Sequence, residues 1–256
     1  MAEQRGRRYR RKRTGGRKFL RGISMAIVVI AILAGCVYLL KAERIDVEGA
    51  SRYTASQVAE ACGVRQNDNL LLLNKTATEQ AIVRNLPYVH SATVKRVLPD
   101  TLRITLHESP IGGLIYDGTA LWVIDPYGKV MDYTPIDQLV GSGPWVEGLT
   151  AQEGSAVGKT LVVADSQQEQ FQYLQVLLQE LERHDMLAQV SGINCADPGT
   201  LIFDWGGRFT VLVPAQSDLD YKMRYLKSVA AQLESTETGR IDLTRNEAHF
   251  IPTQIS

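Results

Sequence analysis

The sequence predicts an α+β protein: one apolar helix, then a small sheet with two helices, then a β-rich domain with packed helices. Three observations carry this prediction. Residues 23–40 form a run of eighteen residues without a charge. Residues 45–108 change between strand and helix periodicity in the order β-α-α-β-β. Beyond them, short alternating segments separated by Gly and Asp turns surround two helical stretches.

The apolar run at 23–40 predicts a transmembrane helix, because eighteen residues span about 27 Å, close to the hydrocarbon thickness of a bilayer. Residues 1–22 form a basic tail with ten Lys and Arg and one acid, Glu3. Basic residues that flank a span stay on the cytoplasmic side, so the tail is expected inside the cell and the domains outside. The expected topology determinants are Arg10, Arg11, Lys12, Arg13, Arg17, Lys18 and Arg21.

Two alternatives concern this N-terminal region. Residues 33–36 resemble the lipobox of bacterial lipoproteins, which would place a cleavage site before Cys36. The apolar run continues beyond Cys36, and this favours an uncleaved anchor. The basic tail could also bind nucleic acid. Since a span begins so soon after it, we expect a topology signal and no nucleic-acid partner.

The first domain is expected at residues 43–110. Residues 45–49 alternate as a strand, and a helix is expected from the N-cap Thr54 to a stop at Gly63. The spacing of Thr76 and Glu79 predicts a capping box that opens a second helix. Four leucines at 70–73 are interpreted as a buried segment between the helices. Residues 89–97 and 102–108 alternate as two strands of a single sheet.

The β-rich domain is expected at residues 111–246, followed by a C-terminal tail at 247–256. It begins with a hairpin at Asp117-Gly118. A helix is expected from Asp165 or Ser166 to about His184, and a second from Ser217. Strands are expected at 190–194, 201–204, 209–213 and 240–244.

The sequence offers little for catalysis, so we expect no enzyme activity, no catalytic residues and no cofactor. Its four histidines lack paired-ligand spacing, and no metal site is expected. Cys195 could be the nucleophile of a sortase-like transpeptidase, with His249 and Arg245 as helpers. A buried free thiol is the preferred interpretation for Cys195, and for Cys62.

Binding is the expected function, and the candidate site is an exposed sheet edge near the C-terminus. An edge strand presents unpaired N–H and C=O groups onto which a partner strand can be added. The expected partner-binding residues are Ile241, Leu243, Ala248 and Phe250. Burial of Ile241 and Leu243 in the domain's own core is the alternative that the pattern leaves open.

Three motifs resemble a known family. Residues 46–49 (Asp-Val-Glu-Gly), the leucines at 70–73, and residues 86–102 with their Pro-Tyr-Val, Ala-Thr-Val-Lys-Arg and Pro-Asp-Thr-Leu segments are similar to the POTRA domain of the FtsQ/DivIB cell-division proteins. The hairpin at 121–130 and the segment at 240–244 resemble that family's second domain, and Lys222 matches a family lysine. Glu108-Ser109-Pro110 departs from the family's Glu-Arg pattern.

The resemblance implies a non-enzymatic, single-pass divisome scaffold at the division septum that helps regulate septal peptidoglycan synthesis. It implies FtsL/DivIC and FtsB-like coiled-coil proteins as partners of the β domain, and other divisome members as partners of the POTRA domain. A POTRA-bearing secretion component is the third alternative. The chain shows one such unit and no room for a barrel.

Overall fold

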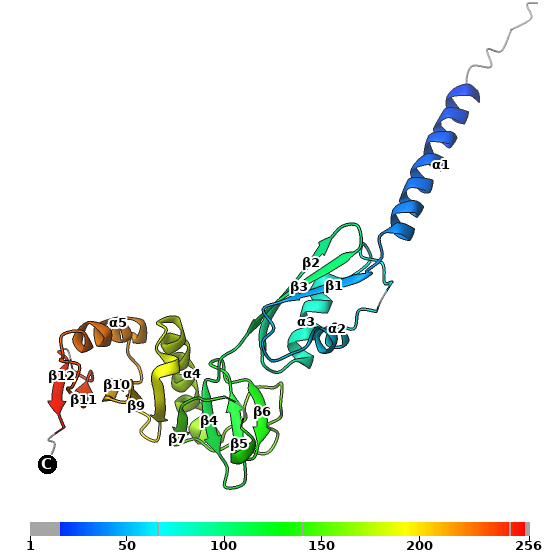
Figure 1. Cartoon of the computed structure of the whole chain (residues 1–256). Helices are drawn as coiled ribbons and strands as arrows, with labels where there is room; N and C mark the ends of the chain where they lie inside the picture. The colour runs from blue at the N-terminus through cyan, green and yellow to red at the C-terminus, as the bar shows by residue number, and fades with distance from the viewer. Residues whose placement is uncertain (1–15, 66, 140, 246, 254–256) are drawn as a thin grey trace, which may run out of the picture.

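The computed structural model describes residues 16–65, 67–139, 141–245 and 247–253, without the side chains of 16–20, 33, 34 and 36–39 (Figure 1). The described structure begins with α1 (Gly16–Leu39), which starts seven residues before the expected helix at 23. Within the described residues, no helix combines the length and the apolarity needed to cross a membrane. Two α+β domains follow α1.

The first domain is a three-stranded sheet covered by two helices, as the periodicity predicts. Its sheet has the order β1 (Arg44–Glu48), β3 (Thr101–Glu108), β2 (Val89–Val97). β1 runs parallel to β3, and β2 is antiparallel to it. The helices α2 (Ala55–Cys62) and α3 (Lys75–Asn85) pack on one face and close a separate core around the sheet.

The start of α2 matches its sequence prediction, and the start of α3 does not. Thr54 caps α2 in a full capping box with Gln57, and Gly63 ends it in the left-handed conformation at φ 68°. The expected box at Thr76 is wrong, because α3 begins at Lys75 and its N-cap is Asn74, whose side chain accepts the Ala77 N–H at 3.2 Å. Asparagine is as good an N-cap as threonine. The helix therefore starts after Asn74, two residues before the expected cap.

The four leucines at 70–73 do not form one buried segment. Leu70 lies in the core, whereas Leu71 and Leu72 are 41% and 75% exposed. The segment is a turn in which the side chain of Asn69 accepts the N–H groups of Leu71 and Leu72. Because this turn redirects the chain, Leu70 is buried and Leu73 packs partly buried against the core, while Leu71 and Leu72 point to the surface.

Glu108, at the end of β3, forms hydrogen bonds with the segment that follows β1. Its carboxylate accepts the backbone N–H groups of Ser51 at 2.8 Å and Arg52 at 3.0 Å, and the Ser51 hydroxyl. Partial burial acts to raise the pKa of Glu108, but these hydrogen bonds outweigh it and hold the pKa below its usual value. The interaction therefore stabilises the folded state fully above the unfolded-state pKa of about 4.3. This stabilisation disappears as the pH falls through the folded-state pKa of Glu108.

We expect Glu108→Gln to lower the free energy of unfolding by about 1 kcal/mol at pH 7, because a neutral amide is a weaker acceptor for these donors. As the pH falls toward 3 the wild-type carboxyl gains a proton, so the difference should shrink. Urea titrations at both pH values measure it, with Glu43→Gln at an exposed position as the matched control. An equal loss at both pH values would contradict the assignment.

The second domain is built on one nine-stranded sheet, in the order β12-β11-β10-β9-β8-β7-β4-β5-β6. The pairs β10–β11, β7–β8 and β4–β7 are parallel, and the other neighbours are antiparallel. The strands are β4 (Gly113–Tyr116), β5 (Leu121–Ile124), β6 (Val130–Thr134), β7 (Trp145–Glu147), β8 (Val190–Asn194), β9 (Thr200–Trp205), β10 (Phe209–Pro214), β11 (Gly239–Asp242) and β12 (His249–Pro252). The sheet thus continues past the domain boundary expected at residue 246.

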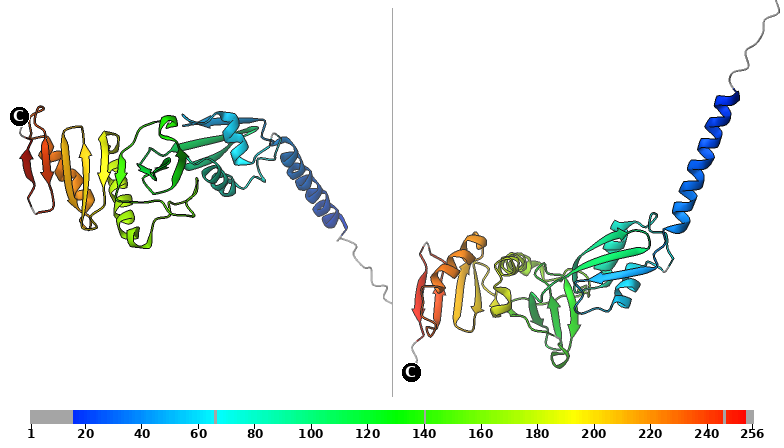
Figure 2. Two further views of the ribbon diagram at one scale, coloured as in Figure 1. Left: turned by 90° about the horizontal axis from the view of Figure 1, so that it is seen from below. Right: turned by 45° about the horizontal axis from the view of Figure 1, so that its top comes forward.

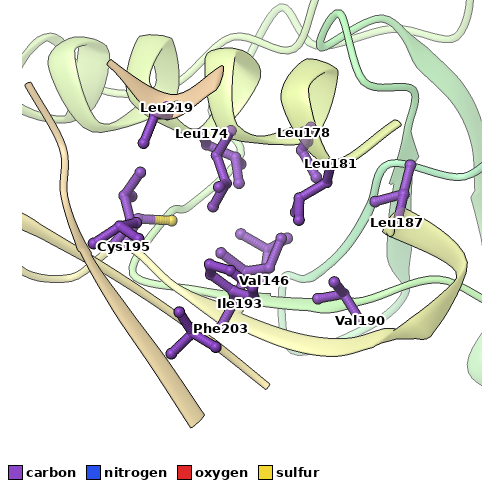
Figure 3. Packing of buried hydrophobic residues seen from close by; sticks show 14 of the residues in the cluster. Val146, Leu174, Leu178, Leu181, Leu187, Val190, Ile193, Cys195, Phe203 and Leu219 are labelled. Carbon is purple, nitrogen blue, oxygen red and sulfur yellow. The ribbon is translucent and has the colours of Figure 1, made fainter. Parts of the chain in front are cut away.

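Two helices cover one face of this sheet. α4 (Gln168–Arg183) and α5 (Leu219–Ala230) lie on the same side (Figure 1), and their apolar faces close the largest core of the protein. Figure 3 shows Leu174, Leu178 and Leu181 of α4 above Val146, Ile193 and Phe203 of the sheet. Asp165, expected as a cap of α4, opens a short 3-10 turn (Asp165–Gln167) and makes no capping hydrogen bond, whereas Asp218 caps α5 by accepting the Tyr221 N–H at 3.0 Å.

The two domains meet where the start of β2 contacts β6 and the loop between β5 and β6. Lys129 Nζ donates to the Val89 carbonyl at 2.7 Å, and the Tyr88 hydroxyl donates to Asp132 Oδ2 at 3.2 Å. The rings of His90 and Tyr127 stack with centroids 4.4 Å apart. Burial and the Asp132 carboxylate raise the pKa of Tyr88 to about 12, so its hydroxyl remains a donor at physiological pH. These contacts fix the orientation of one domain against the other.

Candidate partner-binding edge

The sheet of the second domain ends at β12, at the opposite end of the molecule from α1 (Figure 2). β12 pairs antiparallel with β11 in the register Arg240 to Ile251 and Ile241 to Phe250. Among the described residues, no strand pairs with the outer side of β12. An edge of this kind can accept a strand from another chain.

The register shows which backbone groups of β12 face outward. Thr253 N–H donates to the Thr238 carbonyl at 2.8 Å, which makes that pair a hydrogen-bonded one. Because hydrogen-bonded and non-hydrogen-bonded pairs alternate in an antiparallel ladder, Ile251 and His249 also direct their backbone groups toward β11. Phe250 and Pro252 then direct theirs outward. Pro252 has no N–H, so Phe250 offers the outward donor of this strand.

Burial changes the set of side chains that a partner can reach. Ile241 and Leu243 are completely buried in the core of the domain, because β11 lies inside the sheet and β12 is the edge. The expectation that these two side chains are accessible anchors is therefore corrected. Ala248 and Phe250 are partly buried and pack against the same core. Phe250 meets Phe209 edge to face, with ring centroids 6.2 Å apart.

Ile251 is a surface residue of the edge that the sequence analysis missed. It is 48% exposed, on the opposite side of β12 from Phe250. The sequence could have predicted this exposure. Neighbours in a strand point to opposite faces, so a Phe250 that faces the core implies an Ile251 that faces solvent. Ile251 and the outward backbone of Phe250 thus give this strand an apolar side chain and a hydrogen-bond donor that a partner can reach.

The turn that leads into β12 is tied to α5. Lys222 Nζ donates to the carbonyls of Leu243 at 2.6 Å and Arg245 at 3.3 Å. The Tyr225 hydroxyl accepts the N–H of Ala248 at 3.1 Å. The two carbonyls and the N–H on the turn are backbone groups, and their partners are side chains of α5, so α5 holds the edge strand in place.

The topology determinants of the N-terminus are only partly within the described structure. Arg10, Arg11, Lys12 and Arg13 lie outside the described residues. Arg17 and Lys18 belong to α1, but their side chains lie outside the description, as does that of Cys36. Arg21 is exposed on α1.

Cys195 is a core thiol. It is buried below α4 and Leu219 (Figure 3), and its Sγ donates to the Glu147 carbonyl at 3.3 Å. Burial raises the pKa of Cys195 to about 12, which opposes the thiolate that a nucleophile needs. His249 and Arg245 are exposed around the edge strand. Cys62 is likewise a buried free cysteine, as predicted for both.

Comparison with known proteins agrees with this architecture. Residues 40–109 match the POTRA domain, FtsQ-type. A cell division protein FtsQ of Corynebacterium glutamicum is 35% identical over 147 residues, which cover 56% of this chain and 63% of that protein.

Two further relatives carry the same name. A cell division protein FtsQ of Anaeromyxobacter sp. is 30% identical over 44% of this chain and 42% of its own length. Another, of Streptomyces coelicolor, is 26% identical over 52% of each chain. The matched segments thus span about half of the curated relatives. Residues 40–109 thus match a POTRA domain of the FtsQ type, and the chain is similar to three proteins named cell division protein FtsQ.

Proposed function

We propose that the protein is a non-enzymatic divisome scaffold whose second domain binds a coiled-coil division protein by strand addition to β12. The partners would be FtsL/DivIC and FtsB-like proteins, and the complex would help regulate septal peptidoglycan synthesis. The observation that carries the proposal is the outer edge of β12, where the backbone of Phe250 faces outward beside the exposed Ile251. The POTRA match and the similarity to FtsQ proteins support the setting in cell division.

The proposal includes a single-pass anchor at residues 23–40, with the tail in the cytoplasm and both domains outside. It rests on the sequence, in which eighteen uncharged residues follow ten basic ones. The protein would act at the membrane of the division septum. The POTRA domain would contact other divisome members, and the exposed Leu71 and Leu72 are apolar side chains that such a contact could cover.

Site-specific photo-crosslinking in dividing cells tests the edge. A photoreactive amino acid in place of Ile251 is expected to capture a small coiled-coil protein, identified by mass spectrometry. The same probe in place of the exposed Glu153, remote in sequence from β12, is the control. Equal capture at both positions, or none at position 251, would remove the support for strand addition.

A membrane-anchored, sortase-like cell-wall enzyme is the rival function, and Cys195→Ala distinguishes the two. A scaffold needs a folded domain and no reactive thiol, so the Cys195→Ala variant should still support division. The smaller core side chain should cause a small loss of stability. Loss of division in a variant that folds normally would favour the enzyme.

A further inference from the structure

Three potential metal ligands converge where α4 ends and α5 begins. Glu180 and the C-cap residue His184 are four positions apart and lie on one side of α4, and Asp220 lies in the first turn of α5. His184 Nε2 is 2.9 Å from Asp220 Oδ1 and 3.9 Å from Glu180 Oε2. One ligand atom from each residue lies within 4.8 Å of the other two. Asp220 lies 36 positions after His184 in the chain, so the packing of the two helices brings it to the other two residues.

A second observation at this cluster points to a ligand. Glu180 is only 9% exposed, and its Oε2 is buried without a hydrogen-bond partner among the described residues. A buried carboxylate oxygen without a partner is costly, and such atoms are rare in folded proteins. This oxygen is the atom of Glu180 that lies near His184 Nε2.

The other oxygens of the two carboxylates are already occupied by arginines. Arg183 Nη1 lies 3.0 Å from Glu180 Oε1, and Arg224 Nη2 lies 2.8 Å from Asp220 Oδ2. Each arginine holds one oxygen and leaves the other directed toward His184. Carboxylates that bind metals are commonly oriented in this way by a hydrogen-bonding outer shell.

We propose that Glu180, His184 and Asp220 bind a divalent transition metal, with zinc the best match to one imidazole and two carboxylates. Zinc binds such ligands at about 2.0–2.2 Å, so tetrahedral ligand atoms lie about 3.3 Å apart. The separations of 2.9 and 3.9 Å around His184 Nε2 lie on either side of that value. A water molecule would complete the coordination.

The charges around the cluster set the expected affinity. Two carboxylates and two guanidinium groups sum to zero, so a zinc ion enters a site without net negative charge. We therefore expect micromolar affinity rather than the tighter binding of thiolate sites. Bound zinc would join α4 to α5, the helix that holds the β11–β12 turn through Lys222, and would stabilise the edge strand.

The test uses the purified, untagged full chain with ZnCl2 alone as the probe. Isothermal titration is expected to give one equivalent with micromolar affinity. Zinc at 100 times the dissociation constant should increase the folded-to-unfolded ratio about 100-fold and raise Tm by several degrees, an effect that EDTA reverses. Cobalt should give the visible absorption of a tetrahedral site.

Glu180→Gln and His184→Gln should each lower zinc affinity at least tenfold and abolish the cobalt spectrum. Glu182→Gln on the same helix and the exposed His107→Gln are the matched controls, expected to bind as the wild type does. If a Gln variant at 180 or 184 unfolds, Asp220→Asn provides the same test from the other helix. Absent binding below millimolar zinc, or binding that survives these ligand substitutions, would overturn the proposal and leave an ion-pair cluster only.

Discussion

Phe250→Pro is expected to lower affinity for the coiled-coil partner about 100-fold. The substitution removes the outward N–H of β12 and obstructs the added strand, and the loss of about two hydrogen bonds corresponds to about 3 kcal/mol. Because the Phe250 backbone faces away from β11, pairing within the domain should persist, and proline is tolerated on edge strands. Co-purification and titration calorimetry with the partner measure the effect.

Phe250→Leu is the matched control, since it retains the N–H and most of the packing against Phe209. It should bind within a few-fold of the wild type. Ile251→Asp tests the exposed side chain separately, and it should weaken binding without changing the fold. Unchanged co-purification of a folded Phe250→Pro protein would refute strand addition at this edge.

Lys129→Met is expected to lower the free energy of unfolding by about 2 kcal/mol and to loosen the domain junction. Lys129 donates to Val89 across the junction and is the cation nearest in sequence to Asp125, which is 1% exposed. Burial raises the pKa of Asp125, and the Lys129 charge and two backbone N–H bonds oppose that rise. Without Lys129, both Asp125 and the Val89 carbonyl lose a favourable partner.

Adding Asp125→Asn to Lys129→Met should recover part of the loss, because an amide oxygen can still accept the N–H groups of Tyr127 and residue 129. Urea unfolding of the wild type, the two single variants and the double variant gives the coupling free energy between the two residues. Small-angle scattering measures whether the two domains become more mobile at the junction. The exposed Lys159→Met is the control. Equal effects of Lys129→Met and Lys159→Met would exclude a special role for the junction.

Local patterns predicted most of the first domain because its elements are specified by neighbouring residues. Thr54, Gln57 and Gly63 determine the ends of α2 almost alone. Where two caps compete within a few residues, as Asn74 and Thr76 do, sequence spacing cannot rank them. Leu71 and Leu72 show a second limit of prediction from sequence. Their apolar character predicts burial, but the turn at Asn69 directs their side chains to the surface.

The candidate edge was harder to predict because edges are decided by pairing between distant strands. The sequence placed extended segments near Ile241 and Phe250, but only the register shows that β12 covers β11 and buries Ile241. The Glu180, His184 and Asp220 cluster is similar. The spacing of Glu180 and His184 was visible in the sequence, while Asp220 joins them only through the packing of α4 against α5.

The separation of α1 from β12 sets a minimum length for a partner. The first helix and the last strand lie at opposite ends of the elongated protein, with both domains between them (Figure 2). A partner that runs beside α1 and also pairs with β12 must therefore extend past two domains. An α-helix of about 20 residues covers only about 30 Å. A shortened partner would reach one end of this protein and leave the other free, so partner length itself would select which complexes can form.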